Sequence, residues 1–381
     1  MKIVGYETFS VAPRWQFLRI DTDEGVSGWG EPIVEGRAEA VQGAVAAMME
    51  YLVGTDPLRI EEHWQTLAKG GFYRGGPVLS SALAGIDQAL WDIKGRYHDV
   101  PVHELLGGPV RDRARIYTWA HGADNAALVD DAQAKVANGF TAIKMNVSEA
   151  LPPVPGAADL RAMVSRVAAL RSALGDGVDI ALDFHGRLST AATRQLLPLL
   201  EPLLPFFVEE PVLPEFSRDL RRVVESTGIP IATGERLFSR WDFRDVLPTG
   251  IAIAQPDISH AGGISEVRRI AAMAEAYDVA VAPHCPLGPI TLAASLQLDF
   301  ATPNFLIQEQ SLGIGYGGAG QLLDYLVDPQ VFAFVDGHIE RPTGPGLGID
   351  VDENAVRAAA AGPHRWRSPV FRHTDGSFAE W

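Results

Sequence analysis

The sequence predicts a β/α barrel, to which the two ends of the chain add a smaller α+β unit. From about residue 114 onward, eight short apolar segments recur, and all but the last are followed by a helix-like segment. Near-continuous apolar strands that alternate with helices are typical of parallel sheets buried on both faces, and eight such units favour closure into a barrel. The length of 381 residues suits either two domains or one large barrel with an added piece.

The eight expected strands fall within residues 116–310, and the barrel is placed at residues 114–312. In chain order, the strand segments are IYTWA, TAIKMN, DIALDFH, PFFVEEP, IPIATGE, IAIAQPD, VAVAPHC and FLIQEQ. An open doubly wound sheet would also alternate strands and helices. However, the phosphate-binding glycine fingerprint that follows the first strand of such a sheet is missing, so the barrel is favoured.

The flanking residues, 1–113 and 313–381, show no such alternation. An alternating apolar pattern predicts strands on both sides of the turn at residues 23–25, and helical periodicity predicts helices at about 37–53, 57–69 and 78–98. The last helix is apolar on most sides, which indicates a buried helix. The segment at 342–352 is interpreted as an extended chain that returns to the N-terminal region. Residues 1–113 and 313–381 are therefore expected to form the α+β unit together.

The composition excludes several classes of protein. With 47% hydrophobic and 21% charged residues, the chain is neither disordered, collagen-like nor a coiled coil. Its 48 acidic against 32 basic side chains give a formal charge of −16, so we expect no contact with nucleic acid or with a membrane surface. No apolar run approaches the ~18–20 residues that span a bilayer. A start without signal-peptide features and a single cysteine, Cys285, favour a cytoplasmic location.

Six ionisable residues stand at the carboxyl ends of successive predicted strands. Taken alone, each could be a solvated loop residue or a helix cap. In a β/α barrel, however, these strand ends meet at the face where active sites lie, and six in a row favour an active site. The six, spaced 26, 26, 22, 27 and 25 residues apart, are Asp183, Glu209, Glu235, Asp257, His284 and Glu309.

Three of these residues are carboxylates from adjacent strands, which would repel one another near one point. A divalent cation would relieve the repulsion between Asp183, Glu209 and Glu235, and an all-oxygen ligand set favours Mg²⁺, with Mn²⁺ as a substitute, over zinc. The Asp-x-His spacing of Asp183 and His185 also differs from the His-x-His of barrel zinc hydrolases. Glu210 competes with Glu209 for the ligand role, and strand alternation alone does not decide between them.

Two histidines have the surroundings expected of an acid–base pair. Asp257 and His284 end neighbouring strands, and a carboxylate bound to one ring nitrogen would orient His284 and raise the basicity of the other nitrogen. His185 follows Asp183 by two residues, so both side chains can point inward. The other eight histidines are expected to be structural, although a cavity-facing position is an open alternative for His121.

Longer motifs around these residues resemble the enolase superfamily, in the acid-sugar dehydratase branch related to mandelate racemase. The resemblance covers essentially the whole chain and implies a (β/α)₇β barrel beneath a capping domain built from both termini. The motifs that carry it are PRWQFLRIDTDEGVSGWGEP (13–32), GGFYRGGP (70–77), SALAGIDQALWDIKG (81–95), LDFHGR (182–187), EEPV (209–212), GERLFSR (234–240), QPDISHAGGI (255–264), APHCPLGPI (282–290) and IQEQSLGI (307–314).

The resemblance also implies roles for the residues at the strand ends. The three carboxylates would hold Mg²⁺, with Glu209 rather than Glu210 as the middle ligand. His284, with Asp257 behind it, would remove the proton at C2 of a sugar acid. His185 would protonate the departing 3-hydroxyl, and Glu309 would hydrogen-bond the substrate carboxylate.

The implied reaction is the Mg²⁺-dependent dehydration of D-galactonate to a 2-keto-3-deoxy acid. Gluconate, mannonate and fuconate are alternative substrates, and a catalytically silent sugar-acid-binding barrel is an alternative from another class. Two-base racemases of this type carry Lys-x-Lys where this chain has Lys144-Met145-Asn146, so racemisation is not expected. Lys144 and Asn146, which can both point inward, and Arg14 in a capping loop are the candidate substrate contacts. A homo-oligomer is also expected.

Overall fold

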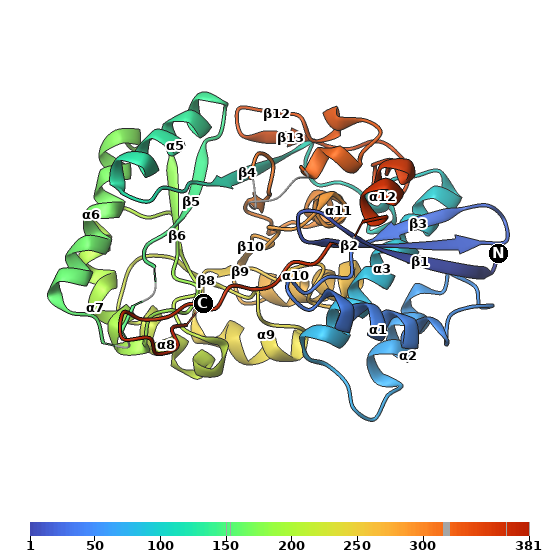
Figure 1. Ribbon diagram of the computed structural model, residues 1–381, viewed down its shortest axis with the longest axis horizontal. Coiled ribbons are helices and arrows are strands. Elements are labelled where there is room, and N and C mark those ends of the chain that lie inside the picture. Colours follow the sequence, from blue (N-terminus) through green and yellow to red (C-terminus); the bar gives the residue numbers. More distant parts are fainter. Residues whose placement is uncertain (150, 153, 315–320, 363, 381) are drawn as a thin grey trace.

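The computed structural model describes residues 1–149, 151–152, 154–314, 321–362 and 364–380, and it contains a barrel beside a small antiparallel sheet (Figure 1). Strands β4 to β10 pair in parallel in chain order. The barrel strands are β4 (Arg113–Trp119), β5 (Ala142–Asn146), β6 (Asp179–Asp183), β7 (Val208–Glu209), β8 (Ile231–Thr233), β9 (Ile253–Ala254), β10 (Ala280–Val281) and β11 (Gln308–Glu309). Each lies within or overlaps one of the eight predicted segments.

The chain around β11 closes the barrel. Gln308 and Glu309 pair in parallel with β4, while Phe305 forms a parallel bridge with Val281 of β10. The backbone N–H of Leu306 also donates to the carbonyl of Val281 at 2.8 Å. Because β11 pairs with β4 and the residues just before β11 bridge to β10, the eight strands form a closed ring, as predicted for a barrel.

Side chains from all eight strand segments, some of them one residue outside the paired strand, fill the barrel interior, so the barrel is a packed core rather than a pore. Large rings from two strands meet edge to face, with the centroids of Tyr117 and Phe207 6.3 Å apart, and alanines from other strands make room for them. This interior cluster consists of Tyr117, Ala142, Ala181, Phe207, Ala232, Ile253, Ala282 and Ile307.

Each of the first seven barrel strands is followed by an α-helix. Two of these helices begin with a side-chain cap, since Asp124 and Ser189 accept hydrogen bonds from the backbone N–H groups of Ala127 and Ala192. The helices are α5 (Asn125–Ala137), α6 (Ala157–Leu174), α7 (Thr190–Leu200), α8 (Leu220–Val224), α9 (Arg240–Val246), α10 (Gly263–Glu275) and α11 (Pro289–Ala301). Short 3₁₀ turns lie at Glu201–Leu203, Pro214–Asp219, Leu247–Thr249, Leu322–Tyr325 and Pro329–Phe332.

The N-terminal residues form a separate sheet covered by helices. The sheet contains β1 (Ile3–Val11), β2 (Trp15–Thr22) and β3 (Ser27–Gly30), followed by α1 (Ala38–Met49), α2 (Ile60–Lys69), α3 (Gly76–His98) and α4 (Val102–Leu105). Helix α3 is buried through its middle, as predicted. It lies so close to β3 that a Cβ on Gly30 would approach the carbonyl oxygen of Gly85 to 1.8 Å, so only glycine fits there.

The C-terminal residues contact both units. The hairpin of β12 (Phe334–Val335) and β13 (His338–Glu340) pairs antiparallel with β4, while α12 (Glu353–Ala360) packs against β1. On that helix, Arg357 forms an ion pair of 2.6 Å with Glu7. Residues 342–352 were expected to be extended, and their β-pairing is limited to isolated bridges through Gly346 and Val351. These contacts do not define where one domain ends and the next begins, so the boundaries at 113/114 and 312/313 stay a prediction. No described helix is long and apolar enough to cross a membrane.

Candidate active site

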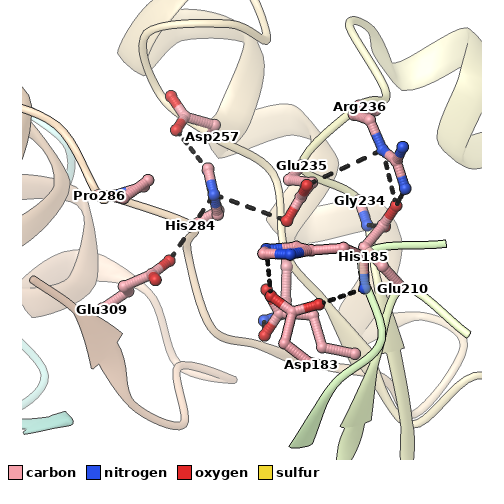
Figure 2. A network of polar contacts seen from close by, with 12 residues as sticks. Asp183, His185, Glu210, Gly234, Glu235, Arg236, Asp257, His284, Pro286 and Glu309 are labelled. Carbon is pink, nitrogen blue, oxygen red and sulfur yellow. Dashed lines mark hydrogen bonds and ion pairs between the residues drawn. The ribbon is translucent and has the colours of Figure 1, made fainter. Parts of the chain in front are cut away.

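The six predicted strand-end residues come together at one end of the barrel, beside a cavity of about 470 Å³. Figure 2 shows five of them: Asp183, Glu235, Asp257, His284 and Glu309. Asp183 and Glu209 end their strands, Glu235 follows β8, and Asp257 and His284 form a parallel bridge beyond β9 and β10. The parallel register brings these ends level, since Asp183 pairs with Glu209. The cavity is therefore placed where barrel enzymes bind their substrates.

Three carboxylates form the acidic cluster expected from the sequence. Asp183, Glu209 and Glu235 each offer a ligand atom, and these atoms lie within 4.8 Å of one another. Burial raises the pKa of Glu209 and of Glu235, and the neighbouring carboxylates act in the same direction. The buried Oε2 of Glu235 accepts no hydrogen bond from any described residue. A donor set of closely spaced carboxylate oxygens fits a hard divalent cation such as Mg²⁺.

Lys144 lies beneath this cluster rather than in the cavity wall. Its Nζ is 2.6 Å from Glu209, 3.0 Å from Glu309 and 3.9 Å from Asp183, and the side chain is fully buried. Although burial lowers the pKa of Lys144, the surrounding carboxylates raise it well above its ordinary value. The structure thus surrounds the lysine with carboxylates, and its predicted contact with substrate stays a prediction.

The other two candidate substrate contacts, Asn146 and Arg14, both line the cavity. The Oδ1 of Asn146 is buried and accepts no hydrogen bond within the described part of the chain. The guanidinium of Arg14, from the turn between β1 and β2, donates to the carbonyl of Pro286 at 3.2 Å and lies 3.5 Å from Glu35. Their roles toward substrate stay predictions.

His284 and Asp257 form the predicted pair. The Nδ1 of His284 is 2.7 Å from Asp257, whose other oxygen accepts the backbone N–H of Ser259 at 2.7 Å. The Nε2 of His284 faces the site, 3.6 Å from Glu235 and 3.9 Å from Glu309. Burial lowers the pKa of His284, but Glu309, Glu235 and Asp257 together raise it well above its ordinary value.

His185 reaches the same cavity from a different strand (Figure 2). Its Nε2 lies 2.9 Å from Asp183, and its backbone N–H donates to the same carboxylate at 2.7 Å. The residue has a φ of +49°, in the left-handed region, and Gly186 follows at +68°. This tight turn at the end of β6 aims the imidazole back over the acidic cluster, and Trp119 packs against the ring with 5.8 Å between centroids.

Glu210 points away from the acidic cluster, so Glu209 is the glutamate of the two that belongs to it, and its role as a metal ligand stays a prediction. One oxygen of Glu210 accepts from Nε and Nη2 of Arg236, at 3.0 and 2.5 Å. The other accepts from the hydroxyl of Thr233 at 2.6 Å and from the backbone N–H of Gly234 at 3.1 Å. This network fixes the turn that carries Glu235 into the site.

Glu309 is held by three donors. The Nε1 of Trp119 donates to it at 2.6 Å, the backbone N–H of Cys285 at 2.9 Å, and Lys144 contacts it at 3.0 Å. Despite its burial, Lys144 and His284 lower the pKa of Glu309. The predicted donation of a hydrogen bond to substrate therefore requires Glu309 to gain a proton when substrate enters.

Several cavity residues were not predicted. His260, expected to be structural, lines the cavity, with Ser81 at 3.0 Å from Nδ1 and Glu35 at 3.7 Å from Nε2. Its position three residues after Asp257, on the same turn, was the available signal. His121 also lines the cavity, so its open alternative is the one observed. Trp366 comes from the C-terminal tail, where no pattern in the sequence marked it.

Comparison with known proteins identifies the class of this fold and site. Residues 127–355 match the Enolase C-terminal domain-like family, and residues 7–107 match the Mandelate racemase / muconate lactonizing enzyme, N-terminal domain. The chain therefore belongs to the mandelate racemase/muconate lactonizing enzyme family of the enolase superfamily.

Particular relatives narrow the comparison further. The chain is 53% identical to the D-galactonate dehydratases of Ralstonia nicotianae and Variovorax paradoxus, with 100% of both chains covered in each case. A crystal structure of an enolase from Agrobacterium radiobacter, with bound Na and L-malate, is 34% identical over 100% of both chains, with a TM-score of 0.92. The mandelate racemase/muconate lactonizing enzyme of Jannaschia sp. CCS1 is 30% identical, with 96% of this chain and 100% of that chain covered and a TM-score of 0.87.

Proposed function

We propose that this protein dehydrates D-galactonate to 2-dehydro-3-deoxy-D-galactonate. The observation that carries the proposal is the pair of histidines from different strands facing one cavity beside three clustered carboxylates. Full-length identity of 53% to D-galactonate dehydratases supports the choice of substrate. A cytoplasmic homo-oligomer is proposed along with this activity.

The first step is removal of the proton at C2. That proton is weakly acidic, because its loss places a second negative charge on an already charged carboxylate. Nε2 of His284 takes the proton, while Asp257, at 2.7 Å from Nδ1, holds the ring and stabilises its charged form. Mg²⁺, held by Asp183, Glu209 and Glu235, would supply positive charge beside the substrate carboxylate, and Mn²⁺ is the expected substitute.

Glu309 acts at the other side of the substrate carboxylate. A second anion close to a buried carboxylate raises its pKa, so substrate binding favours a proton on Glu309. The protonated side chain then donates a hydrogen bond as charge builds on the substrate, and Asn146 and Arg14 are the proposed contacts to the rest of the molecule. Lys144 offsets the remaining negative charge from below.

The second step is loss of the 3-hydroxyl. His185 donates a proton to that oxygen, the C3–O bond breaks, and water leaves. Overall, the hydrogen at C2 and the hydroxyl at C3 are lost as one water. The enol that remains gains a proton at C3 and loses the proton of its C2 hydroxyl, which gives the 2-keto-3-deoxy acid. Two separate histidines allow one to act as base while the other acts as acid.

The test is incubation with D-galactonate and Mg²⁺ in D₂O, followed by NMR. The 2-keto-3-deoxy acid is expected from the wild type and from a control, His98→Asn, which alters an exposed histidine outside the cavity. His284→Asn should stop both C2 exchange and product formation, whereas His185→Asn should stop product formation and retain exchange at C2. Turnover of gluconate, mannonate or fuconate in place of D-galactonate would show that the proposed substrate is wrong and identify that acid as the substrate. Turnover that survived both variants would overturn the acid–base assignment.

A further inference from the structure

The C-terminal tail returns to the candidate active site after α12. Figure 1 shows it running from α12 back across the molecule toward the barrel. Trp366 and Ser368 line the same cavity as His185 and His284. A segment from the end of the chain therefore forms part of the wall of the cavity whose floor is made by barrel strands.

Contacts on both sides of Trp366 hold this part of the tail, residues 364–368, against the N-terminal residues 13–39. We refer to residues 364–368 as the strap. Ser368 lies very near the backbone of Gly36. A Cβ added to Gly36 would be 2.4 Å from the hydroxyl oxygen of Ser368. The anchoring contacts are His364 Nε2 with the carbonyl of Pro13 at 2.8 Å, Arg365 with Glu39 at 2.8 Å, and the Ser368 hydroxyl with the carbonyl of Glu35 at 3.4 Å.

The indole of Trp366 is half-buried and packs on a charged group of the cavity. The guanidinium carbon of Arg14 lies over its ring, 5.3 Å from the centroid. Arg14 in turn donates to the carbonyl of Pro286, two residues after His284. The position of Trp366 is thus tied both to the N-terminal unit and to the turn that follows His284.

The geometry of the proposed reaction fixes which end of a ligand meets the strap. The carboxylate and C2 must lie beside the acidic cluster and His284, at the ends of the barrel strands. The carbons beyond C3 then extend toward the N-terminal side of the cavity, where Arg14, Glu35 and Trp366 lie. An aromatic ring with one polar N–H suits a hydroxylated carbon chain, because its face packs on C–H groups and its edge can donate a hydrogen bond.

We propose that Trp366 is a specificity-determining residue that contacts the distal carbons of the sugar acid, C5 and C6. The strap holds it in place. This inference rests on the proposed function, since it takes a sugar acid as the ligand. It predicts that Trp366 matters for six-carbon acids and not for acids too short to reach it.

The test compares Trp366→Ala and Trp366→Phe with the wild type on D-galactonate and on threonate, a four-carbon sugar acid. Trp241→Ala is the matched control, since this tryptophan is 43% exposed and lines a different groove. Loss of the aromatic contact to the ligand is expected to raise KM for D-galactonate by ~10-fold or more in Trp366→Ala, with kcat nearly unchanged. Trp366→Phe should retain most of the affinity, and threonate kinetics should change by less than ~2-fold.

Binding is measured separately by calorimetry with D-galactonate and Mg²⁺. The proteins compared are the wild type and His284→Asn, the latter alone and combined with Trp366→Ala or with Trp241→Ala. If the wild type binds D-galactonate without dehydrating it, the proposed function fails, and weaker binding in the Trp366 variant still supports this inference. D-galactonate affinity that matches the Trp241→Ala control would overturn it, as would equal losses for the four- and six-carbon acids. Absence of sugar-acid binding by the wild type would overturn both proposals. If Trp366→Ala does not fold, Trp366→Leu takes its place under the same criteria.

Discussion

Replacing Lys144 by methionine removes a fully buried positive charge that lies within 4 Å of three carboxylates of the site. Methionine keeps the unbranched shape of the lysine stem, so the change in packing is small. The lost contacts are those to Glu209 at 2.6 Å and to Glu309 at 3.0 Å, with Asp183 at 3.9 Å. The variant therefore leaves a group of buried anions without their cation.

The size of the effect follows from burial. Removing one partner of a buried ion pair costs ~3–5 kcal/mol, because the remaining charge stays desolvated. In domains of 150–250 residues, 1 kcal/mol shifts the melting temperature by ~2–4 °C, and the shift is smaller in longer chains. We expect Lys144→Met to lower the melting temperature by roughly 5–10 °C in metal-free protein.

The assay is calorimetric melting in EDTA and in excess Mg²⁺. The deficit should be much smaller in Mg²⁺, because a bound cation would neutralise the same carboxylates. Lys135→Met is the control, since its ion pair with Asp131 is long, at 4.0 Å, and partly exposed to solvent. It should shift the melting temperature by about 1 °C or less. A Lys144→Met protein that melts with the wild type in EDTA would refute the argument, and so would equal deficits with and without Mg²⁺.

Three further predictions concern the His284–Asp257 pair, the pH dependence of stability, and the metal requirement. Asp257→Asn keeps a side chain of the same shape at 2.7 Å from His284 but removes its charge, so kcat should fall ~10–100-fold with little change in melting temperature. An unchanged kcat would contradict the role of Asp257 in supporting His284 as the base. Burial raises the pKa of Asp87 to about 7, so its contribution to stability is fully present below about pH 4 and is lost as pH rises through 7. Relative to the wild type, Asp87→Asn should therefore gain stability between pH 5 and pH 8 in urea titrations, and a constant difference would count against the shifted pKa. Chelation with EDTA should abolish dehydration, with Mg²⁺ or Mn²⁺ restoring it, and turnover that persists in EDTA would exclude a metal requirement.

Local sequence pattern determined the barrel and the general place of the site. Each strand is a short apolar run bounded by a helix, so its position can be recognised without knowledge of its neighbours. The polar residue that ends each run, such as Asp183 or His284, is equally local. Because parallel strands in a barrel end at one face, strand order alone was enough to bring these residues together.

Tertiary structure decided which way the neighbouring side chains face. Glu209 and Glu210 are adjacent in the sequence, and the difference arises from the bonds that Arg236, more than twenty residues later, makes to Glu210. The position of Lys144 on its strand does not determine whether it faces a ligand or the carboxylates. The packing of the barrel places it beneath the carboxylates.

The C-terminal tail is the part of the chain whose structure could be predicted least from the sequence. Trp366 lies in a tail without periodicity, and its place in the cavity depends on contacts with residues more than 300 positions earlier. Periodicity reports which face of a strand or helix is buried, so it predicts repeating elements and the residues at their ends. Contacts between irregular segments have no such repeat, and only the folded chain determines them.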